Sequence, residues 1–172
     1  TQKQSKSQLF TGDGIMINIS DYLNYQICVG ELYSKLLDAA AEEHKLTKPE
    51  AAILIFLKNN PDFDTARDIA KYRGLSKAYV SKAVDHLLQK SLITVVTDKV
   101  DRRLQRLKLT AKAQLPADRL RQVQIHFVDM ITRGISEHEK SIFVSSMEKI
   151  SSNAEQILGG LVKIDKSDDE TC

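Results

Sequence analysis

The chain has 172 residues, of which 42% are hydrophobic, 28% are charged and 6% are aromatic. That length suits one domain, or one domain with an added oligomerisation element, and the composition is that of an ordinary folded protein. No stretch approaches the roughly 20 apolar residues that a membrane span needs, and the polar N-terminus lacks the apolar core of a signal peptide. These observations predict an intracellular, cytoplasmic protein with no membrane partner.

Metal-binding and enzymatic functions lack their usual sequence signals. The two cysteines, Cys28 and Cys172, form no Cys-x-x-Cys motif and no Cys/His pair at zinc-finger spacing. The chain has no Gly-rich phosphate loop, no His-Glu-x-x-His, no Gly-x-Ser-x-Gly and no convincing nucleophile–base set. We therefore expect neither an enzyme nor a bound metal or cofactor.

The first 46 residues predict an arm and one helix. Residues 1–19 begin as a polar stretch and end in alternating isoleucines, which indicates a flexible or extended arm. Ser20 or Asp21 can cap the helix that follows, and we expect this helix to end near Glu43. Its apolar face recurs at spacings of three and four, at Tyr22, Tyr25, Val29, Leu32 and Leu36.

The next three helices have clear start signals. Thr47 and Glu50 form a capping box, and the following AAILIFLK is apolar nearly all round, which predicts a central helix. Thr65 begins a short helix that ends at Gly74, and Ser76 caps another. Two short helices joined by about three residues that include a glycine are typical of a helix-turn-helix.

The pattern then changes from helical to extended. Residues 92–98 are rich in β-branched side chains, a charged turn follows, and residues 104–110 alternate apolar with basic side chains. A helix-turn-helix followed by a two-stranded hairpin with a basic tip is a winged helix. The expected fold class is mainly α with a small β hairpin, a winged helix-turn-helix flanked by N- and C-terminal helices.

The remaining residues return to helix. Pro116 opens or kinks a long helix near its start, and Gly134 ends or bends it. Ser136 and Glu139 form a third capping box, and Gly159–Gly160 weakens the end of the helix that follows. The seam of that helix has the spacing 4-3-4-3-4, at Phe143, Met147, Ile150, Ala154, Ile157 and Leu161. These stripes lie outside the winged helix, which predicts that the outer helices pack against a second copy of the chain.

The net charge of +2 hides an uneven distribution. Residues 65–112 hold twelve basic and four acidic residues, a net charge of +8, whereas the rest holds 13 basic and 19 acidic residues, a net charge of −6. A basic module within an acidic frame is typical of a nucleic-acid binder. Because this charge coincides with the helix-turn-helix and the hairpin tip, we favour that interpretation over a merely solvated surface.

Residues 75–110 combine Leu-Ser-x-x-x-Val-Ser, a leucine-rich helix, Leu-Ile and Asp-x-x-Asp-Arg-Arg with a strand that ends in Leu-Thr. This combination resembles the recognition helix and wing of the MarR-type transcriptional regulators, and the order of elements fits from about residue 20 to 160. The matching residues are Leu75, Ser76, Val80, Ser81, Leu92, Ile93, Asp98, Asp101, Arg102, Arg103, Leu109 and Thr110. Three positions depart from the pattern: Ser91 and Ala113 replace glycines, and Val100 occupies a slot near the wing tip that a proline often precedes.

The exposed N-terminal part of a recognition helix reaches base edges in the major groove. The DNA-contacting residues that we expect there are Ser76, Lys77, Ala78, Ser81 and Lys82. The resemblance implies that the wing reaches the minor groove with an arginine, Arg102 or Arg103, with Lys99 on the DNA backbone. It also implies that Asp98 and Asp101 hold the shape of the wing, with Asp101 and Arg103 structural and Arg102 at the tip.

The resemblance implies a sequence-specific regulator of transcription that binds double-stranded DNA at a pseudo-palindromic site. We expect a homodimeric repressor that a small organic effector releases from DNA. The expected parts are an arm (1–19), a dimerisation helix (20–46), the winged helix-turn-helix DNA-binding domain (47–112), further dimerisation helices (113–162) and an acidic tail (163–172).

Two alternatives remain. Some relatives sense oxidants through a cysteine near the start of the first helix, and Cys28 lies among Tyr22, Tyr25 and Tyr33. The simpler interpretation of Cys28 is a small buried apolar residue. The second alternative is a winged helix that serves protein contacts without specific DNA binding.

Overall fold

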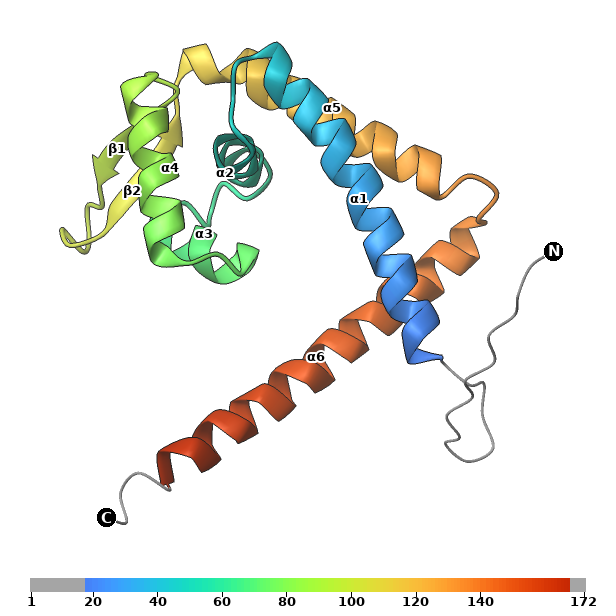
Figure 1. Ribbon diagram of the computed structural model, residues 1–172. Coiled ribbons are helices and arrows are strands. Elements are labelled where there is room, and N and C mark those ends of the chain that lie inside the picture. The colour runs from blue at the N-terminus through green and yellow to red at the C-terminus, as the bar shows by residue number, and fades with distance from the viewer. Residues whose placement is uncertain (1–17, 168–172) are drawn as a thin grey trace. The chain divides into compact units, whose positions relative to one another are not determined.

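The computed structural model describes residues 18–167, with side chains from residue 18 to residue 159. Its elements in chain order are α1 (Ile19–Glu43), α2 (Lys48–Asn59), α3 (Ala66–Arg73), α4 (Lys77–Gln89), β1 (Ile93–Thr97), β2 (Gln105–Leu109), the 3-10 helix η1 (Ala111–Ala113), α5 (Gln114–Ile131) and α6 (Glu137–Ser167) (Figure 1). The chain divides into two compact units, one that ends at Ile131 and one that begins at Thr132. The predicted fold class, mainly α with a small hairpin in a winged helix-turn-helix, is confirmed.

Helix α2 forms the centre of the first unit, as its almost uniformly apolar sequence predicts. Ile53, Leu54 and Ile55 are completely or almost completely buried. Figure 1 shows α2 nearly end-on, with α4 and the hairpin on one side and α1 and α5 on the other. The core continues through Ile69 of α3, Val80 and Leu87 of α4, Leu107 of β2 and Leu120 of α5. Burial of each such side chain contributes about 1.5–3 kcal/mol, so packing around α2 fixes the module that carries the wing.

The three predicted capping boxes begin α2, α3 and α6. The backbone N–H of Thr47 donates to Glu50 at 2.7 Å, and that of Ser136 donates to Glu139 at 2.8 Å. At the start of α3, Thr65 N–H donates to Asp68. The return hydrogen bond is present at α3 and at α6, where Asp68 N–H donates to the Thr65 hydroxyl and Glu139 N–H donates to the Ser136 hydroxyl. These local hydrogen bonds satisfy N–H groups that the start of a helix leaves unpaired. The capping residues therefore predict where these three helices begin.

Helix α1 begins earlier than its sequence suggested. The cap is Asn18, whose Oδ1 accepts from the N–H of Ser20 at 2.9 Å. The expectation that Ser20 or Asp21 caps the helix is therefore wrong, because both residues already lie in the first turn. Residues 1–17 of the predicted arm lie outside the described residues.

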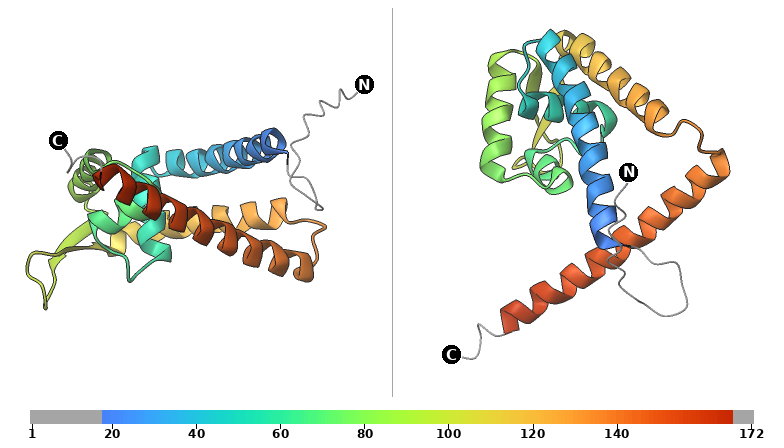
Figure 2. Two further views of the ribbon diagram at one scale, coloured as in Figure 1. Left: turned by 90° about the horizontal axis from the view of Figure 1, so that it is seen from below. Right: turned by 45° about the vertical axis from the view of Figure 1, so that its right-hand side comes forward.

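Helices α1 and α5 pack on one another next to the winged helix. Arg119 of α5 donates two hydrogen bonds of 2.8 Å to the carboxylate of Glu43, and the rings of Tyr33 and Phe127 lie 5.1 Å apart. Beyond this contact the two helices diverge (Figures 1 and 2). Their outer parts therefore present apolar side chains that this unit does not cover, such as Leu23 and Ile27.

The wing is an antiparallel hairpin in which Ile93 lies opposite Leu109 and Thr97 opposite Gln105. An isolated bridge between Arg106 and Thr65 joins β2 to the start of α3. The turn between the strands projects away from the helices (Figure 1). The hairpin is thus paired at its base and free at its tip.

Helix α6 forms the second unit and has 31 residues. It continues through Gly159–Gly160 to Ser167, whereas the sequence suggested that the glycines weaken its end. The predicted acidic tail is therefore helical as far as Ser167, and residues 168–172 lie outside the described residues. No described helix combines the length and the apolar character that crossing a membrane requires.

Candidate nucleic-acid interface

The turn between α3 and α4 sets the direction of the recognition helix. Gly74 ends α3 in the left-handed conformation, with φ of 62°, which a glycine adopts without steric cost. The N–H of Leu75 then donates to the carbonyl of Ala70 at 3.0 Å, and the hydroxyl of Ser76 accepts from the N–H of Tyr79 at 3.2 Å. The chain therefore reverses within three residues and enters α4 with its first turn satisfied.

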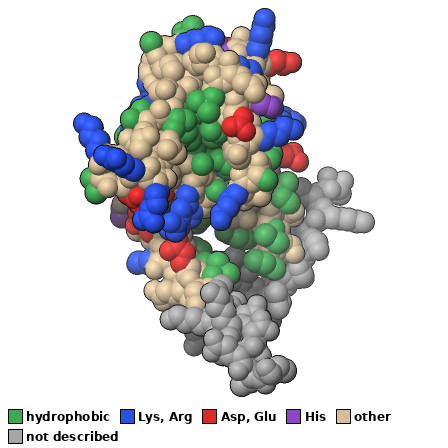
Figure 3. Space-filling model, turned by 90° about the vertical axis from the view of Figure 1, so that its left-hand side faces the viewer, with side chains coloured by type: hydrophobic (Ala, Val, Ile, Leu, Met, Phe, Trp, Pro, Cys, Tyr) green, Lys and Arg blue, Asp and Glu red, His purple; other side chains and the backbone are tan. Residues whose placement is uncertain are grey.

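Helix α4 has one buried and one exposed side. Val80, Ala83, Val84 and Leu87 face the core and are buried. The five residues predicted to contact DNA from this helix are all exposed, namely Ser76, Lys77, Ala78, Ser81 and Lys82. Lys and Arg side chains project from the face of the molecule that carries the hairpin (Figure 3). The N-terminal half of α4 is therefore free to enter a groove.

Asp98 organises the turn of the wing. Its Oδ1 accepts from the N–H groups of Val100, at 2.8 Å, and Asp101, at 2.9 Å. Its Oδ2 accepts from Nε of Arg106. These hydrogen bonds lower the pKa of the Asp98 carboxyl to about 2, from an ordinary value of 3.8. The largest contribution comes from the Asp101 N–H, followed by the Arg106 side chain and the Val100 N–H. The structural role predicted for Asp98 has this physical basis.

Arg106 ties the wing to the helix-turn-helix, a role that sequence reasoning missed. Its Nη1 donates to Asp64 at 2.7 Å while its Nε donates to Asp98. Asp64 lies immediately before the start of α3, is almost completely buried, and also pairs with Lys108 at 2.5 Å. Burial alone would raise the pKa of the Asp64 carboxyl, but hydrogen bonds from Lys108 and Arg106 hold it below its ordinary value.

The two arginines of the wing differ in their surroundings. Nε of Arg103 donates to Asp101 at 3.2 Å, and the backbone N–H of Arg103 donates to the same carboxylate oxygen at 3.0 Å. Within the described part of the chain, Arg102 has no hydrogen-bond acceptor or ion-pair partner. Arg103 is therefore paired and Arg102 is not, and the assignment of a structural role to Arg103 and a DNA contact to Arg102 stays a prediction.

Half of the positive charge of residues 65–112 is already engaged within the protein. Lys90, Arg103, Arg106 and Lys108 form ion pairs, Lys112 donates to a backbone carbonyl, and Lys71 lies over the ring of Tyr72. Six cations of this segment have no acceptor among the described residues: Arg67, Arg73, Lys77, Lys82, Lys99 and Arg102. At most these six cations, rather than all twelve, are available to a partner outside the chain.

A buried ion pair anchors the far end of α4. Glu50 of α2 is almost completely buried and accepts from Nζ of Lys90 at 2.7 Å. Burial raises the pKa of Glu50, but hydrogen bonds from Lys90 and from the Thr47 N–H outweigh it and leave the pKa below its ordinary value. Lys90 also donates to the carbonyl of Lys45, so the residue after α4 is held at two points.

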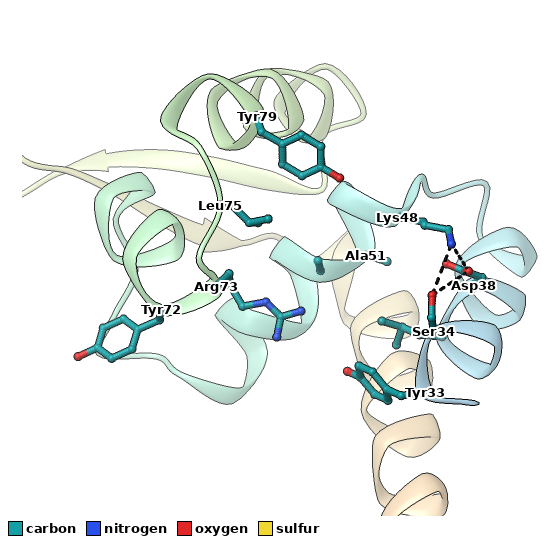
Figure 4. A pocket seen from close by; sticks show the side chains of 11 residues that line it. Tyr33, Ser34, Asp38, Lys48, Ala51, Tyr72, Arg73, Leu75 and Tyr79 are labelled. Carbon is teal, nitrogen blue, oxygen red and sulfur yellow. Dashed lines mark hydrogen bonds and ion pairs between the residues drawn. The ribbon is translucent and has the colours of Figure 1, made fainter. Parts of the chain in front are cut away.

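A cavity of about 350 Å³ lies between α1 and the helix-turn-helix (Figure 4). Tyr33 and Ser34 line it from α1, and Arg73, Leu75 and Tyr79 line it from the turn that leads into α4. Lys48 is already paired with Asp38 in its wall. Figure 4 shows the guanidinium of Arg73 extending toward α1, so this free cation is the charged group that a bound molecule would meet.

Among the described residues, no hydrogen bond joins Cys28 to a tyrosine of α1. The hydroxyl of Tyr22 accepts from Gln26 at 2.7 Å, and that of Tyr33 accepts from Gln124 at 2.7 Å. Cys28 itself is exposed, so the expectation of a small buried residue is wrong for this chain taken alone. The described residues also contain no group of three or more His, Cys, Asp or Glu side chains that could hold a metal.

Comparisons with known proteins give the same picture of the fold. Residues 44–104 match the sequence profile of the MarR family. The chain is similar to a MarR-family transcriptional regulator from Silicibacter pomeroyi, at 21% identity over 80% of this chain and 92% of that one, with a TM-score of 0.68. Similar values hold for S. aureus MepR in a DNA complex (22% identity, 78% and 95% covered, TM-score 0.65). They hold also for S. aureus MarR in complex with salicylate and kanamycin (22% identity, 80% and 93% covered, TM-score 0.65).

Proposed function

We propose that this chain, whose residues 44–104 match the MarR family, is a sequence-specific, homodimeric repressor that a small organic effector releases from double-stranded DNA. The family match over residues 44–104 supports the broader description, a DNA-binding transcriptional regulator. Regulators of this family are not enzymes, in agreement with the missing catalytic motifs.

One observation carries the DNA-binding proposal. Exposed cations without internal partners occur both on the N-terminal half of α4, at Lys77 and Lys82, and on the wing, at Lys99 and Arg102. A recognition helix of this size fits the major groove, and cations on either side of it neutralise backbone phosphates. S. aureus MepR, which has the same fold, was solved in complex with DNA, which supports DNA binding by this chain.

Salt-dependent binding tests the proposal. The full-length protein should bind duplexes from the region upstream of its own gene, and the logarithm of its affinity should fall linearly with that of the salt concentration. Replacing both Lys82 and Arg102 by alanine should reduce that slope by about 1.8, since each lost phosphate contact removes about 0.9. The double variant Lys35→Ala/Lys149→Ala loses the same charge outside the winged helix and should keep the slope. A wild type that prefers no promoter fragment over unrelated DNA refutes sequence-specific regulation.

The homodimer is supported by apolar surface that each unit leaves uncovered when described by itself. On α1, Ile19, Leu23 and Ile27 are exposed, and on α6 the seam residues Phe143, Ile150 and Ile157 are exposed. Soluble chains rarely leave such helical stripes in water, and a two-fold dimer is the commonest way to cover them. Light scattering after size exclusion should give twice the mass of the chain, and a monomer at micromolar concentration refutes the dimer.

The cavity between α1 and the helix-turn-helix supports regulation by an effector. Its walls combine aromatic rings with the free guanidinium of Arg73, a chemistry that suits a planar organic anion. Because Leu75 and Tyr79 belong to the turn and first residues of α4, a bound molecule there would bias the position of the recognition helix. S. aureus MarR, a protein of the same fold, was solved with salicylate, which makes salicylate a suitable probe.

Calorimetry with salicylate tests this part of the proposal. Wild type should bind salicylate and lose DNA affinity in its presence, and Arg73→Gln should bind it at least tenfold more weakly because the charge-assisted bond is lost. Arg67→Gln removes another free cation, one that does not line the cavity, and should bind salicylate as wild type does. If DNA affinity is indifferent to salicylate and related aromatic acids, release by such an effector is wrong.

A further inference from the structure

Val100, at the tip of the wing, is the most exposed large hydrophobic side chain of the described residues, with 96% of its surface accessible. It lies in the turn between β1 and β2, which projects away from the helices (Figure 1). An aliphatic side chain gains nothing from such a position in the free protein. Contact with a partner at this point would remove that apolar surface from water.

The backbone that carries Val100 is fixed, although its side chain is free. The Val100 N–H donates to Asp98, and the turn is closed by the Leu104 N–H on the carbonyl of Asp101, at 2.9 Å, and by the Asp98 N–H on the carbonyl of Leu104, at 3.0 Å. A turn held by several hydrogen bonds presents its side chain with little entropy left to lose on binding. This differs from an apolar residue on a loose loop, which would be ordered only by its partner.

The turn is also coupled to the recognition helix. Arg106 bridges Asp98, inside the turn, to Asp64, immediately before α3, and α3 leads through Gly74 into α4. The wing tip therefore keeps a defined position relative to the helix that we place in the major groove. A tip held in this way can act together with α4 on one DNA duplex.

The charges beside Val100 identify the kind of partner. Lys99 precedes it and Arg102 follows two residues later, and both are exposed and have no acceptor among the described residues. The carboxylate of Asp101, which lies between Val100 and Arg102 in the chain, is paired with Arg103. An apolar side chain between two free cations is complementary to the minor groove, where sugar and base edges lie between two rows of phosphates. Proteins that bind this groove frequently insert an apolar side chain there.

We propose that Val100 packs into the minor groove next to the major groove that α4 occupies, and that it selects A·T over G·C base pairs at that point. This inference rests on the proposed function and adds a residue that reads sequence. The guanine 2-amino group projects from the floor of the minor groove, and a valine cannot accept its hydrogen bond. A·T pairs leave the floor open to the two methyl groups.

The experiment uses full-length protein and a duplex that wild type selects from a random-sequence pool. A·T pairs on either side of the recognition-helix contacts are replaced one step at a time by G·C and by inosine·C. Inosine·C has the major-groove groups of G·C but lacks the 2-amino group, so it separates minor-groove from major-groove recognition. At the positions under the wing, wild type should bind the G·C duplex about tenfold more weakly than the A·T duplex, which is the range for one mismatched pair. It should bind the inosine·C duplex as tightly as the A·T duplex.

Val100→Ala should bind the selected duplex about tenfold more weakly than wild type, because two buried methyl groups are lost. It should discriminate less between G·C and inosine·C and keep the same salt slope. Val96→Ala is the matched control, since Val96 is a half-exposed valine in the stem of β1 and should leave affinity and discrimination unchanged. Neither substitution should lower the melting temperature by more than about 2 °C.

Two outcomes overturn the proposal while leaving the proposed function intact. In one, Lys82→Ala weakens specific binding but Val100→Ala binds as wild type, so that Val100 serves another contact, such as one to a protein. In the other, wild type treats G·C and inosine·C alike at every position, so that no minor-groove selection exists. If wild type selects no sequence from the pool, the proposed function itself fails.

Discussion

Arg106 and Asp64 form an ion pair with 2.7 Å between Nη1 and Oδ1, although 42 residues separate them in the chain. The same guanidinium reaches Asp98, in the wing turn, through its Nε. One side chain therefore spans the base of the hairpin and joins the wing to the entry of the helix-turn-helix. Arg106 therefore stabilises the protein's own fold. Half of the cations of residues 65–112 likewise have partners within the protein.

Asp64→Asn should weaken DNA binding without unfolding the protein. The amide keeps the size of the carboxylate but loses the charge that holds Arg106 and Lys108, so the wing should move relative to α4. We expect a loss of about tenfold in affinity and of about 1–3 kcal/mol in the free energy of unfolding, with the helical circular dichroism unchanged. Asp62→Asn is the control, because Asp62 is exposed and should tolerate the change. Unaltered affinity in Asp64→Asn would show that the wing does not need this anchor.

The wing should loosen in acid over a defined interval. The pKa of Asp98 in the folded protein is about 2, below the ordinary 3.8, so its stabilising contribution is fully present above about pH 4 and is lost as the pH falls toward 2. Carboxyl NMR titration should give an apparent pKa near 2 for Asp98, and the amide signals of Val100 and Asp101 should move with it. In Asp98→Asn those amides should show no transition in this interval. An Asp98 that titrates near 3.8 would mean that the turn is not closed in solution.

Local signals in the sequence predicted most of the fold. The capping pairs that begin α2, α3 and α6, and the left-handed Gly74, act within four residues, so their consequences are visible without the rest of the chain. The cap of α1 was misplaced because Asn18, Ser20 and Asp21 are all good capping residues and only the three-dimensional path of the chain decides among them.

The wing network could not be predicted in the same way. Arg106 and Lys108 alternate with leucines, and this pattern predicts that both lie on the exposed, basic face of a strand. On that basis both belong to the positive charge expected to face DNA. Their partner, Asp64, lies in the loop before α3, and only the bridge between β2 and Thr65 brings it into reach. The sequence therefore overestimates the positive charge that is free of internal ion pairs. The exposure of the α4 positions was predicted correctly, because helical periodicity separates them from the buried stripe.

Arg102 and Arg103 should respond differently to replacement. Arg102 is free, so Arg102→Ala should weaken DNA binding and reduce the salt slope by about 0.9, the value for one phosphate contact. Arg103 is tied to Asp101, so Arg103→Ala should change the slope by less. Titrations of both variants between 50 and 300 mM salt, on one duplex, measure the difference. Equal slopes for the two variants would mean that DNA competes successfully with Asp101 for Arg103.

Ser91→Gly should stabilise the protein. Ser91 follows α4 in the left-handed conformation, with φ of 56°, where a side chain costs about 1 kcal/mol relative to glycine. Its N–H donates to the carbonyl of Leu88, and the next N–H donates to that of Leu87, so the helix end requires this conformation. Glycine should raise the free energy of unfolding in urea by about 0.5–1 kcal/mol and the melting temperature by about 2–4 °C. Gln89→Gly is the control, because Gln89 lies two residues earlier in ordinary helical conformation, and this variant should lower the free energy of unfolding by a similar amount. If Ser91→Gly is less stable than wild type, the serine side chain stabilises the fold by more than its left-handed conformation costs.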